Sequence, residues 1–107
     1  MKPVRPRAAA RTDIDLAVDH YRDEAGAEIA LRFVDALEQA YTRIGETPAA
    51  GSPRWSHELN LPGLRSAPIN GFPWRIFYME LEAYVDVWRV LHARRDIPGW
   101  LSDADGL

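Results

Sequence analysis

Residues 74–92, WRIFYMELEAYVDVWRVLH, decide the fold. Residues 74–81 and 84–92 are rich in aromatic and β-branched side chains, which favour strands, and a tight turn fits around the Glu82-Ala83 pair between them. The stretch therefore predicts two adjacent antiparallel strands. In the second strand both alternating sets of side chains are largely apolar, so neither face of the sheet is expected to be fully solvated. We expect helices on one face, and on the other either the segment 97–101 or a second protein chain.

The regions on either side extend this sheet. Residues 64–69 form a third, short strand, and Asn70-Gly71 is a strong signal for the hairpin turn that follows it. Residues 47–63 contain several prolines and glycines and are expected to be a loop. Residues 3–6 can form only an edge strand or an irregular one, because each proline removes a hydrogen-bond donor from the ladder.

The first half of the chain is helical in pattern. Apolar side chains recur at helical spacing from Ile14 to Ala25 and again from Ile29 to Ile44. The first helix begins either at a cap formed by Thr12 or Asp13 or earlier, within the alanines 8–10, and Gly26 separates it from the second. Two helices joined by one glycine predict an antiparallel hairpin.

These elements predict one α+β domain over residues 1–107, with an N-terminal helical hairpin packed on an antiparallel sheet and a short C-terminal segment. Four acidic side chains of the first helix are expected to form a solvated face, or alternatively to meet basic residues of a partner protein. They are Asp13, Asp15, Asp19 and Asp23.

The composition excludes several classes of function. The chain has no cysteine, a net charge of −3, no apolar run long enough to cross a membrane and no signal-peptide pattern. We therefore expect a cytoplasmic protein that does not bind nucleic acid mainly through many phosphate contacts. His20 and His57 are isolated, and no histidine has metal-ligand spacing, so we predict no metal site and no cofactor.

The end of the last strand carries the candidate functional residues. His92, Arg94, Arg95 and Asp96 form either a clamp for a phosphate or carboxylate with His92 as base, or a strand end at which Asp96 pairs with an arginine and caps the next turn. No nucleophile or metal-ligand partner adjoins His92, so we predict no catalytic residue and favour a surface that binds a partner.

Three further arginines lie on adjacent predicted strands: Arg65, Arg75 and Arg89. Like charges on one sheet repel unless carboxylates face them. They form a groove for acidic residues of a partner, or they pair internally with Glu80 or Asp86. We favour the groove for Arg75 and Arg89 and leave Arg65 open.

Several short motifs occur in an order that resembles the ParE toxins of the ParE/RelE toxin–antitoxin superfamily, and the resemblance extends from about Arg5 to Trp100. The motifs are A-G at 25–26, F-x-x-x-L at 33–37, P-x-x-G at 48–51, L-R-S at 64–66, R-I-F-Y at 75–78 and R-V-L-H-A-R-R-D at 89–96. The resemblance implies a toxin with a RelE/ParE-like fold that inhibits DNA gyrase. It also implies a ParD-like antitoxin, which is encoded beside the toxin and folds onto it. The toxin would then contact DNA only indirectly, through this antitoxin.

The RelE branch of the superfamily instead cleaves mRNA on the ribosome. The nuclease members carry lysines just before the strand that starts at Leu64, where this chain has Leu61 and Gly63, and Trp100 stands near the position of their catalytic tyrosine. An indole cannot ionise, so this departure favours the gyrase-directed branch.

Two alternatives remain: an endonuclease that uses Arg65, Arg75, Arg94 and His92, and a non-toxic homologue that acts only in an autoregulatory complex. The predicted partner-binding residues, for antitoxin or target, are Arg65, Arg75, Trp88, Arg89, His92, Arg94, Arg95, Asp96 and Trp100.

Overall fold

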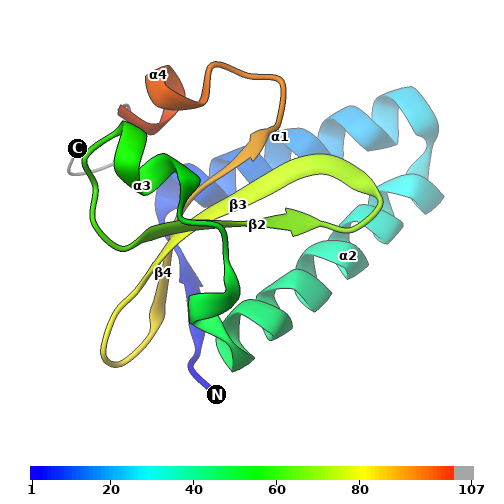
Figure 1. Cartoon of the computed structure of the whole chain (residues 1–107). Helices are drawn as coiled ribbons and strands as arrows, with labels where there is room; N and C mark the ends of the chain where they lie inside the picture. The colour runs from blue at the N-terminus through cyan, green and yellow to red at the C-terminus, as the bar shows by residue number, and fades with distance from the viewer. Residues whose placement is uncertain (103–107) are drawn as a thin grey trace.

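The computed structural model describes residues 1–102 and confirms the α+β prediction, with helices on both faces of one four-stranded sheet (Figure 1). Residues 103–107 of the single domain predicted over 1–107 lie outside the described residues. The elements are β1 (Val4–Pro6), α1 (Ala8–Ala25), α2 (Ala27–Glu46), the 3₁₀ helix η1 (Pro48–Ala50), α3 (Arg54–Glu58), β2 (Leu64–Ile69), β3 (Phe72–Glu80), β4 (Val85–His92) and α4 (Ile97–Ser102).

The sheet has the strand order β1-β4-β3-β2. β2, β3 and β4 form the predicted antiparallel meander, and β1 joins parallel to β4 at the edge, so the sheet is mixed rather than purely antiparallel. The amide of Val85 donates to the carbonyl of Pro3, and the amide of Arg7 donates to the carbonyl of Val87. Gly71, in the turn between β2 and β3, has φ 86°, a conformation that favours glycine.

The helical hairpin covers one face of the sheet (Figure 1). α1 begins at Ala8, so the earlier of the two predicted starts is correct. Phe33 and Leu37 of α2 pack with Ile76 of β3 and Val87 of β4 in the first core cluster. Complete burial of a side chain the size of Phe33 contributes about 1.5–3 kcal/mol. No helix among residues 1–102 is long and apolar enough to cross a membrane.

The opposite face of the sheet is covered by the chain's own C-terminal segment, as the first of the two predicted alternatives states. Ile97 and Leu101 of α4 are buried against Phe77 and Leu91 of the sheet in a second core cluster. α4 is therefore part of the core, and its removal would expose the apolar side chains that it covers.

The segment between α2 and β2 contains two short helices, η1 and α3, where a loop was predicted. Trp55 and Leu59 pack against the second core cluster, so tertiary burial orders a segment whose composition indicates a loop. The hydroxyl of Tyr78 donates to the carbonyl of Pro48 at 2.6 Å. Gly51 lies so close to Tyr78 that an added Cβ would collide with its hydroxyl.

The prediction of a solvated acidic face on α1 is wrong for one residue. Asp15, Asp19 and Asp23 are exposed, but Asp13 is only 8% exposed. Because α1 begins at Ala8, Asp13 lies within the helix and is not its N-cap. Its carboxylate is on the side of the helix that faces the sheet.

Candidate functional site

Arg89 is an internal residue. Its Nε donates to Oδ2 of Asp13 and its Nη2 donates to Oδ1, both at 2.7 Å, and its Nη1 donates to the carbonyl of Trp100 at 3.0 Å. The arginine is 7% exposed. Internal pairing with Glu80 or Asp86 was the predicted alternative to a groove. Arg89 does pair internally, but its carboxylate partner is Asp13. Arg89 therefore does not line an open groove.

The three strand arginines do not share one face of the sheet. Arg65 pairs with Tyr78, whose side chain belongs to the first core cluster, whereas Arg75 pairs with Leu91 in the second. Paired residues of adjacent strands point to the same face, so Arg65 and Arg75 point to opposite faces. Arg65 Nη1 donates to the carbonyl of Gly51 at 2.8 Å, which holds the segment after η1 against the sheet.

Trp88 is also structural. It is 6% exposed, and its Nε1 donates to Oδ2 of Asp86 at 3.1 Å. The guanidinium of Arg7 lies 4.8 Å from the centre of the Trp88 ring and donates to the same carboxylate. Trp88 of the second core cluster therefore contacts Arg7, the residue between β1 and α1, and is not exposed for binding a partner.

Four of the predicted residues do meet at one surface, which we call the α1–β4 trough. It consists of a hollow of about 410 Å³ and a smaller adjoining one of about 50 Å³. Leu16 and Trp100, at 63% and 36% exposure, are two of the four large apolar side chains exposed among residues 1–102. The residues that line the trough include Leu16, His20, Trp74, His92, Arg94, Arg95 and Trp100.

The charge of the trough is positive. Arg94 and Arg95 are exposed, and neither has a carboxylate within 4.0 Å in the described part of the chain. The guanidinium of Arg95 lies 4.4 Å from the centre of the Trp100 ring. Asp96 caps α4 by accepting a hydrogen bond from the amide of Gly99 at 3.4 Å. Half of the structural interpretation of Asp96 therefore holds: it caps the turn, but it forms no ion pair with a described arginine.

His92 stands at the inner end of the trough. Its Nδ1 accepts a hydrogen bond from the amide of Arg94 at 3.1 Å, and its ring lies 5.4 Å from that of Trp74. Burial lowers the pKa of His92, and Arg94, Arg95 and His20 lower it further. The imidazole is therefore neutral at neutral pH, with the lone pair of Nδ1 already engaged.

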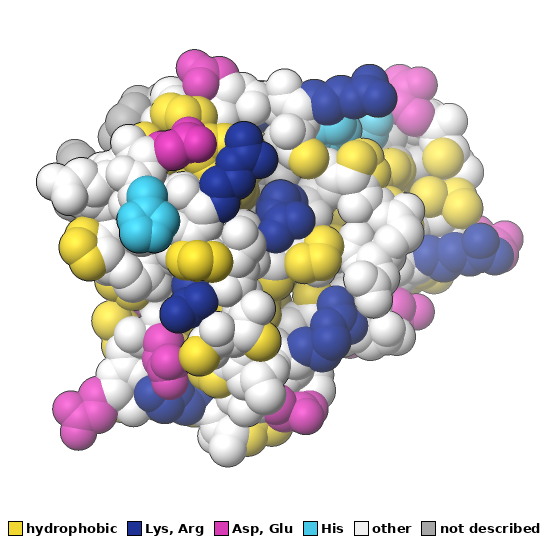
Figure 2. Space-filling view, viewed as in Figure 1, with side chains coloured by type: hydrophobic (Ala, Val, Ile, Leu, Met, Phe, Trp, Pro, Cys, Tyr) yellow, Lys and Arg dark blue, Asp and Glu magenta, His cyan; other side chains and the backbone are white. Residues whose placement is uncertain are grey.

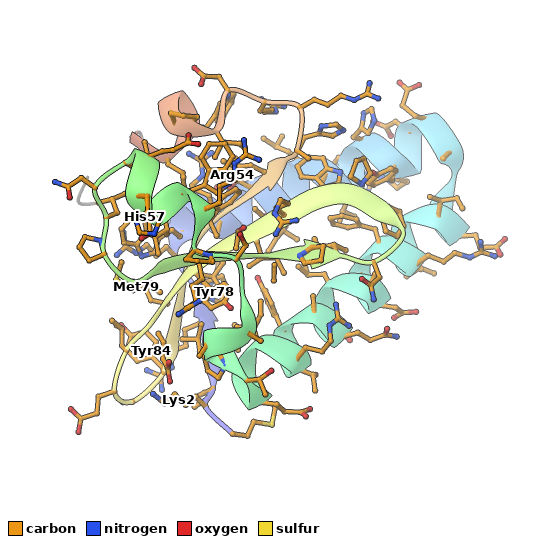
Figure 3. All side chains as sticks on the ribbon, viewed as in Figure 1. Lys2, Arg54, His57, Tyr78, Met79 and Tyr84 are labelled. Atoms are coloured by element: carbon orange, nitrogen blue, oxygen red, sulfur yellow. The ribbon has the colours of Figure 1, made fainter. Side chains whose placement is uncertain are left out.

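A second surface, the basic cleft, lies on the side of the molecule that carries η1 and α3. Two hollows of about 480 and 240 Å³ share Ser52, Ser66 and Arg75. Arg43 lines the larger hollow and Arg54 the smaller one. Figure 2 shows Lys and Arg side chains gathered across the middle of this face, among apolar ones. Figure 3 shows Arg54 at the start of α3.

Of these three arginines, only Arg75 is among the partner-binding residues predicted from the sequence. Its Nε donates to the hydroxyl of Ser66 at 3.1 Å. The sequence did not point to Arg43 or Arg54. Arg43 lies in the last turn of α2, Arg54 lies within the predicted loop, and no sequence spacing relates either of them to Arg75. Among residues 1–102 no group of His, Asp and Glu side chains is arranged to hold a metal ion.

Comparison with known proteins agrees with this architecture. A family model described as "ParE toxin of type II toxin-antitoxin system, parDE" matches residues 4–97. The chain belongs to the ParE toxin family. This assignment makes it the toxin component of a type II toxin–antitoxin system and implies an antitoxin partner.

One solved structure supports the fold of this ParE-family chain. It is titled "Chromosomal ParDE TA system from P. aeruginosa", and the two chains superpose with a TM-score of 0.73 at 20% sequence identity. The match covers 88% of this chain and 98% of the other. A search of curated proteins gave no match.

Proposed function

We propose that this ParE-family toxin inhibits DNA gyrase by binding to it, without catalytic chemistry of its own, and that a ParD-like antitoxin encoded beside it neutralises it. In this proposal the toxin acts in the cytoplasm and contacts DNA only through the antitoxin. The α1–β4 trough is the surface that engages gyrase.

The observation that carries the proposal is the environment of Trp100. The resemblance to the superfamily places the catalytic tyrosine of the nuclease branch near this position. Here the indole contacts two cations, with the guanidinium of Arg89 at 5.4 Å and that of Arg95 at 4.4 Å from its ring centre. An indole donates one hydrogen bond but neither ionises nor accepts a proton, which favours a binding role over acid–base catalysis.

Two titratable side chains near these surfaces, those of His92 and Tyr78, also favour binding over catalysis. The Nδ1 of His92 is engaged by the amide of Arg94, so it is not free to take a proton from a ribose hydroxyl. Burial raises the pKa of Tyr78, whose hydroxyl donates to the carbonyl of Pro48. A tyrosine held in this way is a poor base at neutral pH.

The composition of the trough also suits a protein interface. Trp and Arg are enriched among the residues that dominate interface energies, and aromatic residues and Arg are enriched at interfaces generally. Trp100, Arg95 and Leu16 supply this combination.

A supercoiling assay with purified gyrase, relaxed plasmid and ATP tests the proposal. We expect the chain to reduce supercoiling, and the double variant Arg94→Gln/Arg95→Gln to need at least about tenfold more protein for the same effect, since each trough arginine contributes about 1 kcal/mol to the interface. The double variant Arg22→Gln/Arg32→Gln is the matched control. It removes the same charge from exposed helix positions whose ion pairs contribute little.

Two outcomes would contradict the proposal. Gyrase that is unaffected by the folded wild-type chain excludes it as the target. If the chain also cleaves mRNA in a ribosome-containing extract, the endonuclease alternative replaces it. In cells, growth arrest with induction of a DNA-damage reporter is the result expected for gyrase inhibition.

A further inference from the structure

The basic cleft contains a half-buried cation that lacks an anionic partner within the described chain. The guanidinium of Arg75 donates to the hydroxyl and the carbonyl of Ser66, at 3.1 and 3.4 Å. No carboxylate of residues 1–102 lies within 4.0 Å of it. A cation partly removed from water and bonded only to neutral groups is less stable than one that faces a carboxylate.

The charged side chains nearest to Arg75 make an anion at this position still more favourable. Arg54 and Arg43 line the two hollows that meet at Arg75. Burial lowers the pKa of Arg75, and the positive charge of Arg54 lowers it further. Among the described residues, the one carboxylate that pairs with Arg54 is that of Glu58, at 3.8 Å from its Nε, and its exposed side chain compensates only weakly for the positive charge.

The wall of the cleft is fixed before any ligand binds. Ser52 and Ser66 exchange backbone hydrogen bonds of 2.8 and 2.9 Å, and Arg65 holds the carbonyl of Gly51 from the other face of the sheet. Figure 3 shows Tyr78 below the start of α3, next to the chain that connects η1 to α3. A preformed site loses little conformational entropy when it binds.

The lining of the cleft favours a peptide over a nucleic acid. Its larger hollow is bordered by the apolar side chains Ile44, Ala67 and Pro68 as well as by arginines. The ring of Trp55 is already in contact with other side chains and is less available to stack on a base. The guanidinium of Arg54 lies 4.5 Å from its centre, and the centre of the Phe77 ring lies 6.4 Å from it. A net charge of −3 also disfavours a polyanion along the whole molecule.

We propose that the basic cleft receives an acidic side chain of an otherwise apolar, extended segment of the antitoxin, with the carboxylate bound by Arg75 between Arg43 and Arg54. The inference rests on the proposed function in that the antitoxin is the source of the segment. The ligand chemistry itself, a carboxylate flanked by apolar side chains, follows from the cleft alone.

A titration followed by NMR tests this with three probes: the acetylated peptide AVEVEL, its glutamine counterpart AVQVQL, and a short oligothymidylate. We expect the acidic peptide to shift the amide signals of residues 51, 66 and 75, and the glutamine peptide to bind at least about tenfold more weakly, because a charge-assisted hydrogen bond is lost. The oligothymidylate is expected not to compete.

Two variants locate the site. Arg75→Gln is expected to weaken the binding of the acidic peptide about tenfold, and Arg54→Gln, at an exposed position, to weaken it severalfold. Arg32→Gln, which removes an exposed arginine of α2, is expected to leave the affinity within twofold.

The inference is overturned if the acidic peptide does not bind at millimolar concentration, if its binding is the same in Arg75→Gln, or if the oligothymidylate binds in preference to it. These outcomes are separate from the gyrase assay, which contains no antitoxin. Gyrase inhibition without peptide binding removes only the cleft proposal, and peptide binding without gyrase inhibition removes only the target.

Discussion

Arg89 binds Asp13 through two hydrogen bonds of 2.7 Å, which connect β4 to α1 across 76 positions of the sequence. Oδ2 of the same carboxylate also accepts a hydrogen bond from the amide of Val90 at 3.0 Å, beyond Val87, where the pairing of β1 with β4 ends. The guanidinium also binds the carbonyl of Trp100. One buried ion pair thus fixes the positions of α1, β4 and α4.

The first prediction follows from this pair. Asp13→Ala and Arg89→Met should each lower the free energy of unfolding by about 3–5 kcal/mol, because each leaves a buried charge without its partner. The double variant Asp13→Leu/Arg89→Met should lose less than the sum of the two. Urea denaturation followed by tryptophan fluorescence measures all three.

Asp15→Ala is the control, since Asp15 is exposed on the same helix and its loss should change stability by at most about 0.5 kcal/mol. If the double variant costs as much as both single variants together, the pair is not coupled and this interpretation is wrong.

The second prediction concerns the wall of the basic cleft. Gly51→Ala should displace the segment after η1, because the new Cβ collides with the hydroxyl of Tyr78. Tyr78→Phe removes that hydroxyl and leaves the carbonyl of Pro48 without its donor, at a cost of about 1–2 kcal/mol. Amide hydrogen exchange of residues 50–52 should accelerate in Gly51→Ala.

A double variant sharpens this test. Gly51→Ala should be less harmful in the Tyr78→Phe background, where the colliding oxygen is absent. Equal effects in both backgrounds would show that the close approach of Gly51 to Tyr78 does not hold the segment in place.

The third prediction is a dependence of stability on pH. The folded state lowers the pKa of His92 below its usual 6.5, so the unfolded state binds a proton more readily as the pH falls. The contribution of His92 is therefore fully present above pH 6.5 and is lost as the pH falls through the folded pKa. Protonation also removes the lone pair that accepts the amide of Arg94.

His92→Asn keeps an acceptor at the position of Nδ1 but does not titrate. We expect its free energy of unfolding to vary less than that of the wild type between about pH 7 and pH 5.5, measured by urea denaturation. An identical slope in the variant would assign the pH dependence to other groups.

The sequence predicts the elements of this fold well and its contacts poorly. Residues 64–69 form the strand predicted for them, and the joint at Gly26 has φ 95°, as a tight connection between two helices requires. Such features depend on local patterns of apolar residues and on glycine. Asp13 was assigned to a solvated face because its burial depends on an arginine 76 positions away, which helical periodicity does not reveal.

The same limit applies to the candidate site. His92, Arg94, Arg95 and Trp100 are close in sequence, and the structure brings them to one trough. The basic cleft instead combines residues from α2, α3 and β3. Its residues Arg43 and Arg54 have no sequence signal of their own, because their function depends on a tertiary arrangement.

The fourth prediction separates the role of Trp100 in binding from that of α4 in folding. Truncation after Asp96 would remove Ile97 and Leu101, which are buried, so its effect on toxicity would be confounded by unfolding. Trp100→Ala is the better test because the side chain is partly exposed. We expect it to keep the fold and to weaken gyrase inhibition by about tenfold or more, since central Trp anchors contribute about 2 kcal/mol.

Leu31→Ala is the matched control for this loss, because Leu31 is exposed on α2 and outside the trough. Inhibition that survives Trp100→Ala but is lost in Leu31→Ala would place the gyrase surface on the helical hairpin instead.

The last prediction tests whether the charge of Arg75 destabilises the free toxin. Arg75→Met keeps much of the apolar length of the side chain and removes the charge. The free energy of unfolding should therefore rise by about 0.5–1 kcal/mol, despite the lost hydrogen bond to Ser66. Sulfate, which offers an anion to the cleft, should raise the melting temperature of the wild type more than that of Arg75→Met at equal ionic strength of chloride. Arg32→Met corrects for the general effect of sulfate on folded proteins, because Arg32 is exposed and already paired with Glu28. A wild type that is more stable than Arg75→Met without sulfate, and that responds to sulfate no more than the variant does, would mean that the cleft satisfies Arg75 without an external anion.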